Sequence, residues 1–295
     1  MMVRGCPVFK RTGTSPNYGV GYTIIEVLLF VALTSFLLII AIANINGGQK
    51  QVQFSQGVRD FGSELSDIIN DIPTGFFPTN NALTCTVGGS RPTIDDGGGS
   101  GLGKDDKCIY VGKALQFRPD GDDSKVLVYT LAGQRLTAAG DLVTSIDEAA
   151  PVAVANPADP TFQDTIEEIP LRNGVRISRI FNGDAPTPLA ASMQYGVIAI
   201  VTTFEGTTPT GDVSQAVQIG AVRDTTIGST KLQAYNMINK LQTTSPGNNG
   251  ELVKATGGIV ICLESDNNKK ASIVVGTNGS AGTKFDIDSY DQRCD

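Results

Sequence analysis

The sequence contains no histidine and no tryptophan in its 295 residues. Without histidine, no Ser-His or Cys-His catalytic dyad and no His metal ligand can form. Charge is also sparse, at 18% of residues, with 23 basic against 30 acidic groups. No basic stripe of the kind that binds phosphate backbones is visible, so we do not expect nucleic acid as a main partner. Hydrophobic residues make up 40% of the chain, which predicts a folded protein.

A long apolar run lies near the N-terminus, from Val27 to Ile45. Its 19 residues carry no charge and only three polar side chains. At about 1.5 Å per residue, a helix of this length spans roughly 28 Å, close to the ~30 Å of a hydrocarbon core. Together with Ile24 and Ile25, the run therefore predicts one transmembrane helix.

The residues before this run are basic. Positions 1–21 hold Arg4, Lys10 and Arg11 and no acid, which leaves 20 basic against 30 acidic groups in the rest of the chain. Because basic flanks stay on the cytoplasmic side of a membrane helix, we expect the N-terminus inside. The part after Ile45 is then expected outside the cytoplasm.

Glu26 lies within the apolar segment, where a carboxylate costs about 2.5 to 3.5 kcal/mol at mid-membrane and calls for a partner. The nearest bases, Arg11 and Lys50, are 15 and 24 residues away, so neither can pair with it within one helix. A cut between Gly21 and Tyr22 would create an α-ammonium, with a pKa of about 7.7 to 8.0, four residues before Glu26. Cleavage at this point would therefore supply the missing cation.

The segment Gly21-Tyr22-Thr23-Ile24-Ile25-Glu26, with a basic leader before it and an apolar run after it, resembles the type IV prepilin and pseudopilin family. The resemblance covers residues 1–72. It implies that a membrane aspartyl peptidase cuts after Gly21 and methylates Tyr22, and that Glu26 acts in filament assembly. Mature chains of the family more often begin with Phe. Tyr22 departs from that pattern, and the difference bears on methylation of the new N-terminus.

Three other interpretations of the same segment remain. Ala41-Ile42-Ala43 matches an A-x-A signal-peptide site with a cut before Asn44, although the run exceeds the usual h-region and contains an acid. An uncut signal anchor is the second. In the third, Glu26 only complements the positive end of its own helix, which is worth about 0.3 to 1 kcal/mol.

Beyond the membrane, Asn46-Gly47-Gly48 predicts a bend or a weak point in the helix, since each glycine costs about 1 kcal/mol relative to alanine. An amphipathic stretch then continues to Ile72, and Pro73 ends it. Its expected buried stripe consists of Phe54, Val58, Phe61, Leu65, Ile68, Ile69 and Ile72. The expected outward side chains are Arg59, Asp60, Ser63, Glu64, Asp67 and Asp71.

The rest of the chain reads as short strands between turns, and the fold class predicted is α+β: a long helix on an antiparallel sheet, the ladle shape of pilins. Tyr195–Phe204 is apolar on both faces, as a central strand would be. Leu232–Leu241 is ambiguous between helix and strand, and 136–173 reads as a loop excursion. The remaining predicted strands are Cys108–Phe117, Lys125–Leu131, Gly174–Phe181, Ala216–Val222, Ile259–Leu263, Ser272–Val275 and Lys284–Ile287.

Five cysteines are present, of which Cys6 lies in the predicted leader. The other four allow three pairings, and Cys85 with Cys108 and Cys262 with Cys294 close the shorter loops. We expect this pairing, with free thiols as the alternative. The closed C-terminal loop also resembles that of many pilins, and an oxidising exterior would permit both bonds.

No sequence signature of an enzyme is found, and we expect the protein to have no enzymatic activity. Acid groups such as Asp95-Asp96, Asp105-Asp106, 120–123 and 286–288 could offer oxygen ligands to calcium, but none matches the EF-hand spacing. Solvated turns are their simpler interpretation, so no cofactor is assigned.

The sequence predicts a cytoplasmic leader over 1–21, a transmembrane and assembly helix over 22–46, its amphipathic continuation over 47–72, and an extracytoplasmic β-rich domain over 73–295. The function implied by the resemblance is that of a minor or large pilin, or a pseudopilin. The protein would wait in the cytoplasmic membrane and end in a cell-surface filament. Its partners would be other pilin subunits, the prepilin peptidase and the pilus assembly machinery. The alternative is a membrane-anchored or secreted binding module that forms no filament.

Overall fold

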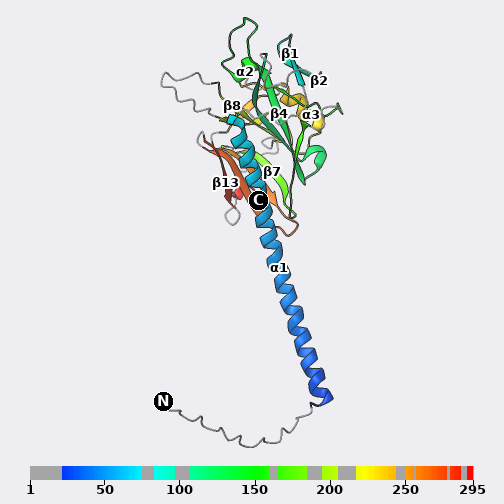
Figure 1. Ribbon diagram of the computed structural model, residues 1–295. Coiled ribbons are helices and arrows are strands. Elements are labelled where there is room, and N and C mark those ends of the chain that lie inside the picture. Colours follow the sequence, from blue (N-terminus) through cyan, green and yellow to red (C-terminus); the bar gives the residue numbers. More distant parts are fainter. Residues whose placement is uncertain are drawn as a thin grey trace, which may run out of the picture. The chain divides into compact units, whose positions relative to one another are not determined.

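The computed structural model describes residues 22–74, 83–96, 107–159, 165–184, 195–204, 217–243, 250–255, 257–277, 280–286 and 291–294. The chain divides into two compact units, Met1–Gln49 and Lys50–Asp295, and each is considered by itself. The first contains the beginning of helix α1 (Ile24–Asp71). The second, the globular unit, contains the end of α1 and every strand described (Figure 1).

Within the described residues the strands form three antiparallel sheets. A hairpin joins β1 (Leu83–Val87) to β2 (Pro92–Asp96). The largest sheet has the order β10-β9-β8-β3-β4-β5, and β6 also pairs with β4. Its strands are β3 (Cys108–Phe117), β4 (Lys125–Gln134), β5 (Val152–Ala153), β6 (Glu167–Pro170), β8 (Val197–Thr202), β9 (Val217–Val222) and β10 (Leu252–Lys254).

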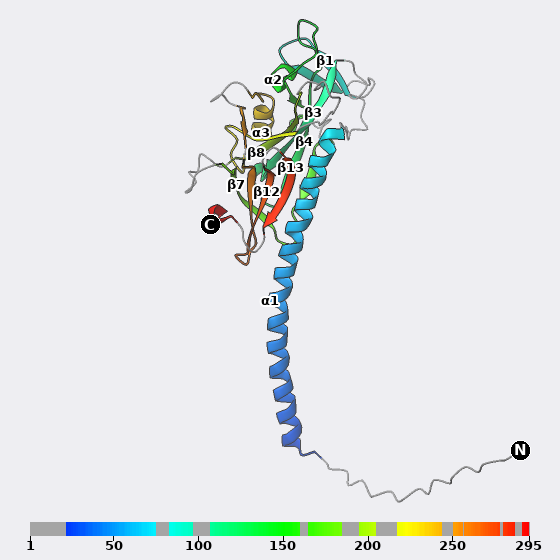
Figure 2. The same ribbon diagram turned by 90° about the vertical axis from the view of Figure 1, so that its left-hand side faces the viewer.

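The third sheet has the order β13-β12-β11-β7. Its strands are β7 (Arg176–Asn182), β11 (Ile259–Glu264), β12 (Lys270–Thr277) and β13 (Ser280–Asp286). Two short helices complete the unit: α2 (Ile146–Ala149) and α3 (Lys231–Ile238). Figure 2 shows β12 and β13 beside the part of α1 that belongs to the globular unit.

The apolar stripe of α1 is the centre of the main core. All seven predicted stripe residues are at most 4% exposed, and they pack with side chains of β3, β4, β7, β8 and β11. Gly57 lets the helix approach the chain before β7, because a Cβ there would lie only 2.7 Å from the Arg172 carbonyl oxygen. The burial of these seven residues confirms the stripe prediction. Burying each large apolar side chain contributes about 1.5 to 3 kcal/mol to folding.

Strand β8 is buried on both faces, as its sequence predicts. Ile198 and Ile200 join the core that contains α1, whereas Val197, Ala199 and Val201 join a second core with Ala234 and Ile238 of α3. The α+β class and the antiparallel sheets are therefore observed, with α1 on one face of this strand and α3 on the other.

Helix α1 continues through Asn46–Gly48, and the bend or weak point expected there stays a prediction. Other expectations need correction. The excursion over 136–173 carries α2, β5 and β6, so it is not simply a loop. The ambiguous segment Leu232–Leu241 is mostly helical, because Thr230 and Gln233 form a reciprocal capping box at the start of α3. The eight predicted strands each overlap a strand of the structure, but β1, β2, β5, β6 and β10 are not predicted.

The predicted outward face of α1 is correct for Arg59, Asp60, Ser63 and Asp67, which are exposed. Glu64 and Asp71 are only half-exposed. Each of these two acids faces the globular unit in part, and both bear on stability below.

Candidate functional site at the N-terminal helix

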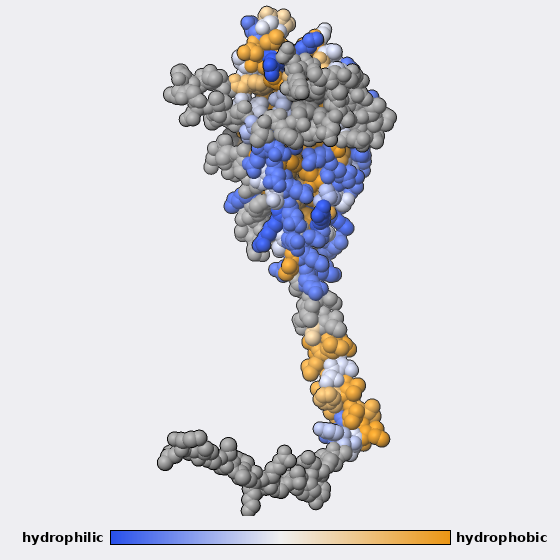
Figure 3. Space-filling model, viewed as in Figure 1, coloured by the Kyte–Doolittle hydropathy of each residue, from blue (hydrophilic) through white to orange (hydrophobic). Residues whose placement is uncertain are grey.

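The first part of α1 presents a mostly apolar surface. Residues Ile24–Ala41 form one helix that is long and apolar enough to cross a membrane, and none of this window is buried (Figure 3). Its large apolar side chains are between 43% and 81% exposed. Apolar area in water costs roughly 25 cal/mol per Å², so a surface this continuous calls for lipid or protein to cover it.

A polar residue within this surface is satisfied by the helix itself. The Thr34 hydroxyl donates to the carbonyl oxygens of Phe30, at 2.9 Å, and Val31, at 3.0 Å. A hydroxyl bonded in this way leaves no open donor to lipid, so Thr34 is compatible with a position inside a membrane.

The start of α1 places Glu26 in the first turn. Thr23 directly precedes the helix, and its Oγ1 accepts a hydrogen bond from the Glu26 backbone N–H at 3.3 Å. Thr23 and Glu26 thus hold the N-cap and N3 positions of a T-x-x-E capping sequence. Among the residues that the structure describes, no cation pairs with the Glu26 carboxylate. The local structure therefore gives Glu26 a capping position, and none of the described residues supplies a cation to its carboxylate.

Only one of the two predicted cleavage residues, Tyr22, lies within the described part of the chain. Tyr22 is 75% exposed and lies ahead of the helix, two residues before its first turn. Gly21 lies outside the described residues. The peptide bond that joins them is the one expected to be cut, and the exposed Tyr22 is sterically open to a modifying enzyme.

Both disulfides are present, in the pairing expected from the sequence. Cys85 of β1 is joined to Cys108 of β3, with the Cα atoms 6.2 Å apart. Cys262 of β11 is joined to Cys294 near the C-terminus, with the Cα atoms 5.5 Å apart. All four are almost fully buried, so each bond closes its loop within the protein.

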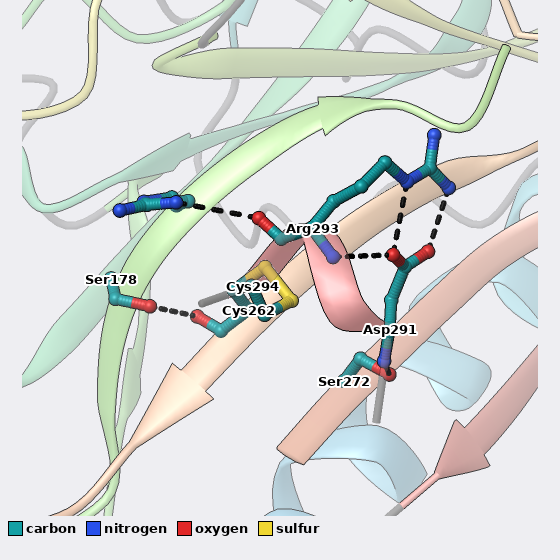
Figure 4. Close-up of a disulfide and its surroundings, with 7 residues drawn as sticks. Ser178, Cys262, Ser272, Asp291, Arg293 and Cys294 are labelled. Carbon is teal, nitrogen blue, oxygen red and sulfur yellow. Dashed lines mark hydrogen bonds and ion pairs between the residues drawn. A yellow bond between two sulfur atoms is a disulfide. The ribbon is translucent and has the colours of Figure 1, made fainter. Parts of the chain in front are cut away.

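Charged groups reinforce the C-terminal closure (Figure 4). Arg293 donates from Nη2 and Nε to the two carboxylate oxygens of Asp291, at 2.6 and 2.9 Å. Arg293 also lies over the Phe181 ring, 4.7 Å from its centroid, and donates to the Gly183 carbonyl oxygen at 2.9 Å. These hydrogen bonds lower the pKa of the Asp291 carboxyl. The C-terminal segment is thus joined to β11 by the disulfide and to β7 by the contact of Arg293 with Phe181, while the ion pair with Asp291 orients the Arg293 side chain within the segment.

The acids of the 120–123 group, which are candidates for calcium, have other partners. Asp120 accepts from the Lys231 backbone N–H, Asp122 accepts from Ser124 and pairs with Lys125, and Asp123 pairs with Arg176. Across the described segments no cluster of three or more acidic or cysteine side chains could hold a metal. Asp105, Asp106 and Asp288 lie outside those segments.

A buried ion pair is a feature that the sequence does not predict. Lys113 of β3 is almost fully buried, and its Nζ lies 3.8 Å from Asp71 Oδ2 and 3.5 Å from Glu167 Oε2. It connects the end of α1 with β3 and β6. An isolated lysine in an apolar strand is the only signal in the sequence that could have indicated it.

Comparison with known proteins gives no further identification: no family model, no curated protein and no solved structure matches this chain.

Proposed function

We propose that this protein is a structural subunit of a type IV pilus or a related filament: a minor or large pilin, or a pseudopilin. The observation that carries the proposal is the motif from Gly21 to Glu26, which lies directly at the start of an apolar helix with no covering protein. Export with the basic N-terminus inside would place the helix in the cytoplasmic membrane and the globular unit outside it.

In this proposal the same helix serves first as an anchor and then as the assembly element. Cleavage after Gly21 removes the basic leader and leaves an ammonium on Tyr22, which is the residue to be methylated. In a filament, the ammonium of one subunit would pair with Glu26 of its neighbour and set the register between them. The exposed apolar side chains of Ile24–Ala41 would then exchange lipid for the helices of other subunits.

The pilin-like arrangement is part of the proposal. The end of α1 packs its stripe into the core of the globular unit, and no residue of Ile24–Ala41 is buried within the described part of the chain. The two buried disulfides suit an oxidising location outside the cytoplasm. No catalytic role and no cofactor are proposed.

N-terminal sequencing and intact mass of the protein purified from its native membrane test the proposal. We expect a chain that begins at Tyr22, carries a methyl group and contains two disulfides. Gly21→Val should abolish the cut, whereas Gly19→Val, two residues upstream, should leave it intact. A native chain that retains residues 1–21, or one that begins at Asn44, would refute the prepilin assignment.

The second candidate is a membrane-anchored binding module that forms no filament. It is favoured by the hydrogen bond from the Glu26 N–H to Thr23, which gives Glu26 a local role in helix capping. In that case fibres sheared from the cell surface would lack this protein, although the anchor and the globular unit remain intact.

A further inference from the structure

A cavity of about 390 Å³ lies between the β1–β2 hairpin, strand β5 and helix α3. This volume falls in the range of small-molecule sites, roughly 300 to 1,000 Å³. Its floor is Val152–Val154, which is buried. Its polar lining comes from Thr93, Asp95, Asn156, Asp159, Tyr235 and Asn239.

The walls of this cavity are fixed by contacts between distant parts of the chain. A two-stranded hairpin has little stability of its own, yet the Cys85–Cys108 disulfide fastens β1 to β3. At the turn end, Arg91 donates from its two Nη atoms to the carbonyl oxygens of Pro151, at 3.0 Å, and Leu241, at 3.4 Å. The hairpin is therefore held to the chain on both sides of the cavity, before β5 and after α3.

The opposite walls are fixed in a similar way. The Asn239 side chain at the end of α3 accepts from the Ala153 backbone N–H at 2.8 Å, which joins the helix to the free edge of β5. Asn156 Oδ1 accepts from the Ala158 N–H at 3.0 Å, which shapes the turn that carries Asp159. A site whose walls are held before a ligand arrives loses little entropy on binding.

The lining selects a ligand class. Asp95 adds a carboxylate to the lining, which disfavours anions. Amide, hydroxyl and carboxylate groups together match sugar hydroxyls, which both donate and accept hydrogen bonds. The Tyr235 ring, half-buried against the second core, and the apolar floor can cover the C–H face of a pyranose. A cation without hydroxyl groups would bind only to the oxygen acceptors of the lining and would leave its donors unused.

We propose that this cavity is a binding site for a neutral saccharide, with Tyr235 as the apolar platform and Asp95 as a hydroxyl acceptor. The site does not depend on the filament function, since it lies wholly within the globular unit. It would give a surface-exposed protein a means of contacting glycans.

The test is saturation-transfer NMR on the full chain in lauryldimethylamine oxide, a detergent without a sugar headgroup. The probes are the methyl glycosides of glucose, galactose, mannose and N-acetylglucosamine. We expect transfer to at least one of them, and a titration should give its dissociation constant. Tyr235→Ala and Asp95→Ala should each weaken binding about tenfold, the effect of losing one well-placed contact. Tyr235→Phe, which keeps the ring, should bind nearly as the parent does.

Asn236→Ala, exposed on α3 outside the cavity, and Asp141→Ala, an exposed acid in another turn, are the matched controls and should change nothing. Absence of transfer to every glycoside would overturn the proposal, as would an equal loss in the controls. Nα-acetyl-lysine methylamide is the competing probe. If it binds through Asp95 while no glycoside does, the cavity recognises a cationic side chain instead, and the saccharide assignment is wrong.

Discussion

Lys113 Nζ lies 3.5 Å from Glu167 Oε2, although only 4% of the lysine side chain is exposed to solvent. The acid is 52% exposed, so the pair joins a buried cation to an anion at the surface. Asp71, at the last residue of α1, approaches the same ammonium from the other side and is 50% exposed. Because of this asymmetry, removing the cation and removing the anions should change the free energy of unfolding by different amounts.

Replacing both acids should be the more damaging change. Asp71→Asn with Glu167→Gln leaves a buried ammonium without an anion, which costs about 3 to 5 kcal/mol. Lys113→Met leaves two acids that water can solvate, so its cost should stay below about 1 kcal/mol. Urea unfolding of the full chain in detergent measures both. The opposite ranking would show that the ion pair does not govern this junction.

Glu64 is an acid whose burial destabilises the fold at neutral pH. Burial against the globular unit raises its carboxyl pKa, with Arg172 opposing and Asp60, Glu167 and Asp67 adding to the rise. Its Oε2 is buried and has no hydrogen-bond partner among the described residues. The folded state therefore holds a proton more tightly than the unfolded state.

This sign fixes the pH dependence. Because the folded pKa lies above the unfolded value of 4.5, the contribution of Glu64 to stability falls as pH rises from 4.5 through the folded pKa. Glu64→Gln should remove that slope and raise stability at pH 7 by less than ~1 kcal/mol. Unfolding midpoints between pH 4 and 7 measure it. Glu264→Gln, an exposed acid on β11, is the control and should keep the slope.

The C-terminal closure should depend on pH in the opposite direction. Hydrogen bonds from Arg293 lower the pKa of Asp291 below 3.8, so this ion pair contributes fully above pH 3.8 and is lost as pH falls through the folded pKa. Asp291→Asn should cost about 1 to 2 kcal/mol at pH 7 and almost nothing in strong acid.

The disulfide at the same place provides a comparison. Cys262→Ser with Cys294→Ser opens a closure of 32 residues and should cost about 2 to 4 kcal/mol at every pH. Unfolding measured at pH 7 and in strong acid, below the folded pKa of Asp291, separates the two effects. A pH-independent cost for Asp291→Asn would show that packing, and not charge, holds the C-terminus.

How much of this could be foreseen depends on whether the signal is local. The stripe from Phe54 to Ile72 repeats at helical spacing, and the two apolar faces of β8 are visible in the chain, so both are predicted correctly. Strand β1 alternates apolar and polar residues but has only five of them, β2 is mostly polar, and β10 has three residues, so these short patterns are easily read as turns.

The cavity and the buried charges depend on tertiary contacts instead. Arg91 reaches the carbonyl oxygens of Pro151 and Leu241, 60 and 150 residues along the chain, and no local pattern encodes such a distance. The burial of Lys113 likewise depends on Asp71 of α1 and Glu167 of β6, which are far apart in the sequence and both lie close to its ammonium. Helix α1 continues through Asn46–Gly48, and the weak point that glycine propensity predicts there stays a prediction.

The charge of Glu26 can be separated from its position in the capping sequence. Gln at N3 supports a capping box as Glu does, so Glu26→Gln keeps the first turn of α1 and removes only the charge. Thr23→Val does the reverse, because it removes the Oγ1 acceptor at a cost of about 0.5 to 2 kcal/mol and keeps the carboxylate.

If Glu26 pairs with a neighbour's ammonium, Glu26→Gln should be exported and cut normally, yet lower the yield of sheared fibres about tenfold for each ~1.4 kcal/mol of pairing lost. Thr23→Val should lower it much less. Equal losses in both variants, or none in Glu26→Gln, would assign Glu26 to capping alone and leave the assembly role without support.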